Sequence, residues 1–234
     1  LASDNMVSIW DLEQQTLQAN VNFNGKINIA KISSLEISNN EDKLLVGMSD
    51  GTINMADINT RVNNQIFPHS RPVTHLRFGP QGNFFLSASE DGLVGLRKFG
   101  TPKAQFTEQF PHRITSLVTD DDFNAYFVSD GLNSQFIKGL QKNELVSQLD
   151  YMDRFKMFRK AKFILNEQYL VTSSSKSQLS FWDQLTGREL GTFKVKSIRK
   201  GATTIDMLSH QENLFTITSD GILQKWNIKD LFQL

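Results

Sequence analysis

The sequence predicts an all-β fold of repeated antiparallel sheets, and two regularities of the 234-residue chain indicate it. The first is a short turn signal, mostly Ser-Asp-Gly, that recurs six times, at residues 3–5, 49–51, 90–92, 129–131, 175–177 and 219–221. Successive turns are 46, 41, 39, 46 and 44 residues apart. The second is that short apolar or alternating segments flank each turn. Asp-Gly and Asp-Asn pairs tolerate positive φ, so each turn predicts a β-hairpin.

Two further strands are predicted in each repeat. Strands ahead of the hairpin are predicted at 32–37, 73–78, 114–118, 162–165 and 203–208, and strands at the end of the repeat at 17–23, 65–68, 104–110, 144–149 and 189–195. The last hairpin strand is predicted at 222–228. No long segment keeps the 3.6-residue apolar period of a helix. Four strands in about 40–45 residues form one blade of a β-propeller.

The position five residues after each turn carries the family signal. It is occupied by Trp10, Ala56, Arg97, Phe136, Trp182 and Trp226, and aspartate follows at Trp10-Asp11 and Trp182-Asp183. This pattern resembles the WD40-repeat family over essentially the whole chain. The resemblance implies one WD40-like β-propeller domain, residues 1–234, with about five and a half four-stranded blades visible. The family most often closes with seven blades, so we expect either a longer chain or missing strands that a partner supplies.

The resemblance also implies a hydrogen-bonded network within each blade, formed by a turn aspartate, a histidine before the first strand and the tryptophan. The aspartate position is occupied by Asp4, Asp50, Asp91, Asp130 and Asp220. The histidine position matches at His69 and His112, and the tryptophan position at Trp10, Trp182 and Trp226. Lys176 departs from the aspartate position, and no blade shows all members. We therefore expect apolar packing, with 18 phenylalanines in the chain, to hold the blades together.

Composition and motifs argue against catalysis. Lysine plus arginine and aspartate plus glutamate both number 25, so the net charge is zero, which excludes a polybasic tail. The absence of cysteine excludes disulfides and thiolate sites. The four histidines lack zinc-site spacing, and no phosphate loop or nucleophilic serine elbow is present. We therefore expect no catalytic residue, cofactor or metal, and read His75, His210 and 120–122 as structural. The first residues do not resemble a signal peptide, and no segment is long and apolar enough to span a membrane. Because the sequence also lacks cysteine and any Asn-x-Ser/Thr site, we expect an intracellular protein, either cytoplasmic or nuclear.

One charged feature stands out from this neutral background. Two basic stretches lie at the same phase of consecutive repeats, and together they contain Arg154, Lys156, Arg159, Lys160, Lys162, Lys194, Lys196, Arg199 and Lys200. They are either solvated loops or one contact surface for an acidic protein or an RNA backbone. We therefore expect a non-catalytic WD40 propeller scaffold that mediates protein–protein interactions within a multi-subunit intracellular assembly. The alternatives are an RNA-associated scaffold, such as a ribosome-assembly factor, and a membrane-coat or trafficking subunit.

Overall fold

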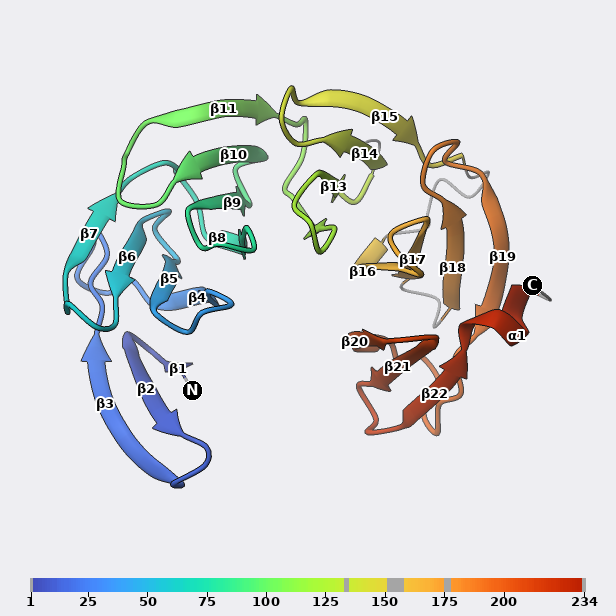
Figure 1. Cartoon of the computed structure of the whole chain (residues 1–234), viewed down its shortest axis with the longest axis horizontal. Coiled ribbons are helices and arrows are strands. Elements are labelled where there is room, and N and C mark those ends of the chain that lie inside the picture. Colours follow the sequence, from blue (N-terminus) through green and yellow to red (C-terminus); the bar gives the residue numbers. More distant parts are fainter. Residues whose placement is uncertain (1, 133–134, 151–157, 175–177, 233–234) are drawn as a thin grey trace. The chain divides into compact units, whose positions relative to one another are not determined.

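The computed structural model describes residues 2–132, 135–150, 158–174 and 178–232. Within these ranges the chain forms 22 strands and one short helix (Figure 1), and every pairing between neighbouring strands is antiparallel. Arg154, Lys156 and the turn at 175–177 lie outside the described residues. The chain divides into two compact units, Leu1–Ile114 (unit 1) and Thr115–Leu234 (unit 2).

Unit 1 contains three sheets, each built from strands that are consecutive in the sequence. The first sheet has three strands and the other two have four. The strands are β1 (Ala2–Ser3), β2 (Met6–Asp11) and β3 (Thr16–Asn22); β4 (Ile32–Ile37), β5 (Lys43–Met48), β6 (Ile53–Asp57) and β7 (Asn63–Ile66); and β8 (Val73–Phe78), β9 (Phe84–Ser89), β10 (Leu93–Lys98) and β11 (Ala104–Gln109).

Unit 2 also contains three sheets, of four, four and three strands. They are formed by β12 (Ser116–Thr119), β13 (Ala125–Ser129), β14 (Gln135–Gly139) and β15 (Glu144–Gln148); β16 (Phe158–Ile164), β17 (Tyr169–Ser174), β18 (Gln178–Asp183) and β19 (Glu189–Lys194); and β20 (Thr204–His210), β21 (Asn213–Thr218) and β22 (Leu223–Asn227). Helix α1 (Ile228–Phe232) follows β22. The predicted all-β fold of repeated, mostly four-stranded sheets is confirmed.

Two of the predicted inner strands have the bounds that the structure gives, whereas other predictions miss a strand end. The predictions 32–37 and 73–78 coincide with β4 and β8. The prediction 162–165 begins too late, because β16 already starts at the buried Phe158, and the exposed Arg159 and Lys160 that follow interrupt the apolar pattern. The prediction 222–228 ends too late, because the backbone turns into α1 at Ile228, whose buried side chain packs against the neighbouring sheet.

The hairpin turns adopt the backbone that their glycines were expected to provide. Gly51, Gly92, Gly131 and Gly221 all have φ between 81° and 89°. At Gly51 a Cβ atom would lie 2.2 Å from the carbonyl oxygen of His69. Glycine at this position therefore allows the turn and the neighbouring connection to touch.

Apolar packing joins one sheet face to the next within each unit. In unit 2, Ile164, Val171 and Leu179 of the β16–β19 sheet pack with Leu214 of β21 in one buried cluster. In the β20–β22 sheet, Phe215 and Leu223 occupy the positions equivalent to Val171 and Leu179. Leu208 lies on the same face, because it pairs with Phe215 as Lys162 pairs with Val171. There, Leu208 and Leu223 are exposed and Phe215 is half-buried. The same register thus forms a buried face in one sheet and an open face in the next.

Candidate functional site

The β8–β11 sheet contains a buried polar network that links two connections. His69 precedes β8, and its Nε2 lies 2.9 Å from Oγ of Ser87 in β9. Its Nδ1 lies 3.4 Å from Oδ1 of Asp91, which stands in the β9–β10 turn. The backbone N–H of Ser70 donates to Oδ2 of Asp91 at 2.8 Å. His69 and Asp91, which the family resemblance places in one network, therefore lie next to each other.

Arg97 occupies the tryptophan position of this blade. Its side chain is buried, and Nη1 donates a 3.0 Å hydrogen bond to Oγ of Ser87. A Cβ atom on Gly95 would lie 2.5 Å from that same Nη1, so the glycine makes room for the guanidinium. The network therefore runs from Asp91 through His69 and Ser87 to Arg97.

The charge of Asp91 is set by these contacts. Burial raises the pKa of its carboxyl group, but the contact with His69 and the hydrogen bonds from the backbone N–H groups of Ser70 and Leu93 outweigh burial and hold the pKa well below its usual range. Burial also lowers the pKa of the Arg97 guanidinium. A charged carboxylate thus anchors the connection before β8 to the β9–β10 turn.

Two tryptophans use the same hydrogen bond that Arg97 makes. Nε1 of Trp182 donates to Oγ1 of Thr172 at 2.8 Å, and Nε1 of Trp226 donates to Oγ1 of Thr216 at 3.0 Å. In all three sheets the acceptor hydroxyl stands ten residues before the donor. Sequence reasoning missed Ser87, Thr172 and Thr216, although this constant offset is the signal that could have found them. Trp10 is about half exposed, at 47%.

Two other turn aspartates also accept hydrogen bonds from backbone N–H groups of the connection that precedes their sheet. Oδ2 of Asp50 accepts a 2.9 Å hydrogen bond from the N–H of Ile27, and Oδ2 of Asp220 accepts from Ile198 and Arg199 at 2.6 and 2.9 Å. The remaining residues of the predicted network differ. Asp130 is buried and accepts a hydrogen bond from the N–H of Leu132. Asp4 forms an exposed ion pair with Lys31, and His112 is half-buried.

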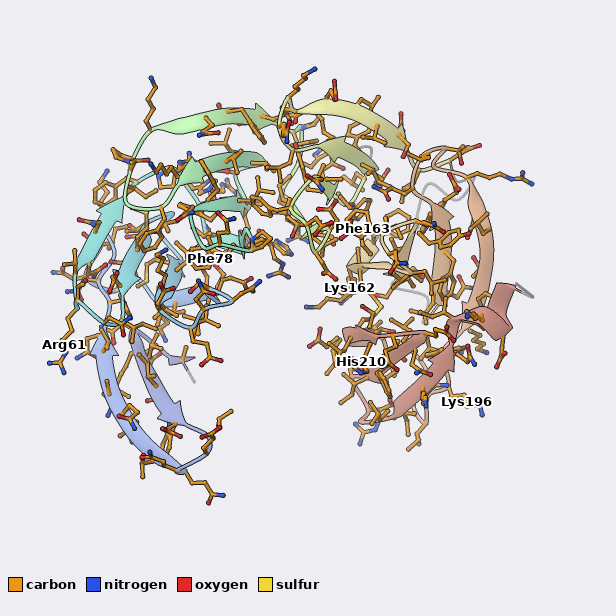
Figure 2. The ribbon with its side chains drawn as sticks, in the orientation of Figure 1. Arg61, Phe78, Lys162, Phe163, Lys196 and His210 are labelled. Carbon is orange, nitrogen blue, oxygen red and sulfur yellow. The ribbon has the colours of Figure 1, made fainter. Side chains whose placement is uncertain are left out.

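The described residues of the two basic stretches lie at the end of β19, in the connection from β19 to β20 and in β16. Lys194 ends β19, and Lys196, Arg199 and Lys200 stand exposed in the connection to β20, which also exposes Ile198. Arg159 and Lys160 are exposed near the start of β16. Lys162 instead forms an ion pair with Asp121 at 3.3 Å. Figure 2 shows Lys162 beside β16 and Lys196 beside β22.

The acidic turn at 120–122 contacts the neighbouring sheet. Oε1 of Glu167, in the β16–β17 turn, accepts hydrogen bonds from the N–H groups of Asp121 and Asp122 at 2.6 and 3.2 Å. Leu165, Asn166 and Glu167 all have positive φ, at 51°, 50° and 68°. Burial, together with repulsion from the Glu167 and Asp122 carboxylates, raises the pKa of Asp120 to about 6. Among the described residues no group of three or more His, Asp or Glu side chains is arranged to hold a metal ion.

Comparison with known proteins agrees with this architecture. The family model "WD domain, G-beta repeat" (WD40) matches residues 61–96, a stretch that includes His69, Ser87 and Asp91. The resemblance to WD40 repeats is thereby confirmed. Such repeats generally form protein-interaction scaffolds and are generally non-catalytic. No curated protein matches the chain.

The fold itself is similar to that of a solved structure. The crystal structure of the computationally designed Ika8 protein superposes with a TM-score of 0.76 at 17% sequence identity, over 96% of this chain. The chain spans 66% of the length of that structure. In the part of the chain that the structure describes, no helix is both long and apolar enough to cross a membrane.

Proposed function

We propose that this protein is a non-catalytic WD40-like scaffold of a multi-subunit assembly, and that it binds an acidic partner protein through a basic surface in unit 2. We define the basic surface as Arg159, Lys160, Lys194, Lys196, Arg199 and Lys200. The observation that carries the proposal is the connection from β19 to β20, which presents exposed cations on a backbone that the neighbouring turn holds in place.

Hydrogen bonds to the neighbouring turn and strand hold this connection. The N–H groups of Ile198 and Arg199 donate to Asp220, and the N–H of Lys196 donates to Oε1 of Gln224 at 2.7 Å. Because the backbone is already ordered, a partner would not have to order it, and less conformational entropy is lost on binding. This supports a binding role rather than a solvated loop.

The cations of the basic surface are available for a partner. Among the ion pairs of the described residues, none involves the six side chains of the basic surface, in contrast to Lys162 and Asp121. The Asp220 carboxylate, which contacts this connection, accepts hydrogen bonds from the backbone N–H groups of Ile198 and Arg199. The exposed Ile198 adds an apolar contact between the charges. A protein surface with carboxylates around an apolar residue fits this arrangement.

Charge reversal tests the proposal. The variant Arg159→Glu, Lys160→Glu, Arg199→Glu and Lys200→Glu should enter the native assembly at least about tenfold less well than the parent at low salt, because several ionic contacts of about 0.2–1 kcal/mol each are lost together. The difference should narrow at high salt, which screens exposed charges. Co-fractionation of the tagged protein with the assembly at two salt concentrations provides the measurement.

The matched control reverses four exposed cations elsewhere: Arg61, Lys98, Lys103 and Lys142. It carries the same change in net charge and should assemble like the parent. If the first variant folds and also assembles like the parent at both salt concentrations, the basic surface is only a solvated region. If ribonuclease treatment alone releases the parent from the assembly, RNA is the partner and the proposal fails.

We also propose that the open face of the β20–β22 sheet packs against a further blade. The support is its equivalence to the buried face of the β16–β19 sheet, where Val171 and Leu179 are buried at the positions of Phe215 and Leu223. Leu208 lies on this open face beside its cross-strand partner Phe215. Exposed apolar sheet faces of this kind usually mark a contact.

Cysteine labelling tests this packing, because the 234 residues contain no cysteine. In this structure Leu208 is 63% exposed and Leu185, in the β18–β19 turn, is 74% exposed. In the intact protein, Leu208→Cys should react with a maleimide at least about tenfold more slowly than Leu185→Cys, because a further blade would cover it. Equal reaction rates would show an open face.

A further inference from the structure

Unit 1 has a continuous edge made of alternating connections and turns. We call this edge the loop rim and define it as residues 26–31, 49–52, 67–72, 89–92 and 110–114. Segments 26–31 and 67–72 are the connections that precede β4 and β8, and segment 110–114 ends unit 1. Segments 49–52 and 89–92 are the β5–β6 and β9–β10 hairpin turns. The loop rim belongs wholly to unit 1 and shares no residue with the basic surface of unit 2.

Contacts at every junction make the loop rim one surface. The N–H groups of Ile27 and Lys31 donate to Asp50 and Ser49, at 2.9 and 3.0 Å. The same turn touches the next connection, where Gly51 faces the carbonyl of His69. Beyond it, Ser70 donates to Asp91.

The last junction joins the turn at 89–92 to the connection at 110–114. The N–H of Phe110 donates to the carbonyl of Gly92 at 2.9 Å, and the N–H of Ile114 donates to the carbonyl of Ser89 at 3.1 Å. All four junctions therefore have direct contacts, so the rim side chains are carried on a fixed backbone.

Large apolar side chains point into solvent from two of these connections. Ile27 is 54% exposed, Ile29 is 84% exposed and Phe67 is 60% exposed. The connections that carry them flank the same turn, Asp50-Gly51, and are therefore close to each other. Three large exposed apolar side chains stand on connections beside one turn, whereas 42 apolar residues of the described part of the chain are buried. This contrast indicates a surface that a partner covers.

Cations accompany these apolar side chains. Lys26, Arg71 and Arg113 are exposed, and none of them takes part in an ion pair among the described residues of unit 1. The rim carboxylates of Asp50 and Asp91 accept hydrogen bonds from backbone N–H groups of the rim, and Asp91 accepts one more from Leu93. Glu90 is the remaining acidic residue of the rim. The exposed polar groups that the loop rim offers a partner are thus mainly cationic donors.

We infer that the loop rim binds an acidic segment of a partner protein that carries aliphatic or aromatic side chains. Its apolar residues would pack on Ile27, Ile29 and Phe67, and its carboxylates would accept hydrogen bonds from Lys26, Arg71 and Arg113. Charge complementarity and the exposed apolar side chains select this occupant over a basic or wholly polar segment. The inference goes beyond the proposed function, because it concerns a second surface in the other unit.

A library of random dodecapeptides displayed on phage, selected on the intact protein, tests the inference without assuming a partner. The selected peptides should be enriched in Asp and Glu together with Leu, Ile or Phe. Synthetic copies should bind the parent in fluorescence anisotropy, and the variant Ile29→Asp, Phe67→Asp and Arg71→Glu should bind them at least about tenfold more weakly. These positions are exposed, and equal thermal midpoints will verify that the variant folds.

Two control proteins make the test specific. The variant Leu12→Asp, Leu185→Asp and Lys103→Glu changes equally exposed residues outside the loop rim, and it should bind within about twofold of the parent. The quadruple variant of the basic surface should also bind like the parent, so failure of one proposal is distinguishable from failure of the other. Peptides without acidic residues, peptides that bind the loop-rim variant like the parent, or a loop rim that binds only single-stranded RNA would each overturn the inference.

Discussion

Replacing Trp182 by alanine should lower the free energy of unfolding by about 3–5 kcal/mol, as expected when a fully buried aromatic side chain is removed. Trp182 is 0% exposed and packs edge-to-face on Phe158, with ring centroids 5.8 Å apart. The substitution would also leave the buried Thr172 hydroxyl without the indole N–H that donates to it. Urea unfolding, monitored by circular dichroism, measures the loss.

Two control variants test whether the loss of stability comes from the burial of Trp182 or from its position in the repeat. Trp226→Ala removes a tryptophan at the same repeat position, with the same kind of hydrogen bond, but its side chain is half-buried, so a smaller loss is expected. Leu185→Ala changes an exposed residue and should stay within about 0.5 kcal/mol of the parent. Similar losses for all three variants would mean that Trp182 does not hold the sheet core together.

His69→Ala should destabilise the protein by about 1–3 kcal/mol at neutral pH, whereas His210→Ala should change the free energy of unfolding by about 0.5 kcal/mol or less. His69 is buried between Ser87 and Asp91, and His210 is exposed at the end of β20. Equal thermal midpoints for the two variants would remove His69 from the polar network.

The pH dependence of the His69→Ala effect gives an independent check. The contacts of Asp91 lower its pKa in the folded state, so its carboxylate stabilises the fold above the ordinary value of 3.8, and this stabilisation is lost as the pH falls below that value. His69→Ala removes one cause of the lowered pKa. The stability difference between parent and variant should therefore be complete above pH 4 and shrink in more acidic solution, as measured by urea unfolding. A difference that grows on acidification would contradict this.

The sequence predicts features that repeat at a fixed phase. β4 and β8 were found because both stand at the same distance ahead of their hairpin turns, and the pairing of His69 with Asp91 likewise follows from the position of both residues relative to the turns. Features that depend on one tertiary contact were not predictable. Nothing in the local sequence tells that Lys162 pairs with Asp121, which lies 41 residues away, and Arg97 is not the residue that the family places at its position. Helix α1 was missed because Ile228 also continues the strand alternation.

The turn at Leu165–Glu167 joins two neighbouring sheets through one carboxylate. Three consecutive left-handed residues are unfavourable for the isolated chain and persist only while their surroundings hold them. Here the surroundings include the N–H groups of Asp121 and Asp122, which belong to the β12–β13 connection. We therefore expect that relaxing the turn would withdraw the Glu167 carboxylate from both amides, and that amide exchange at residues 121 and 122 would report on a turn more than forty residues further along the chain.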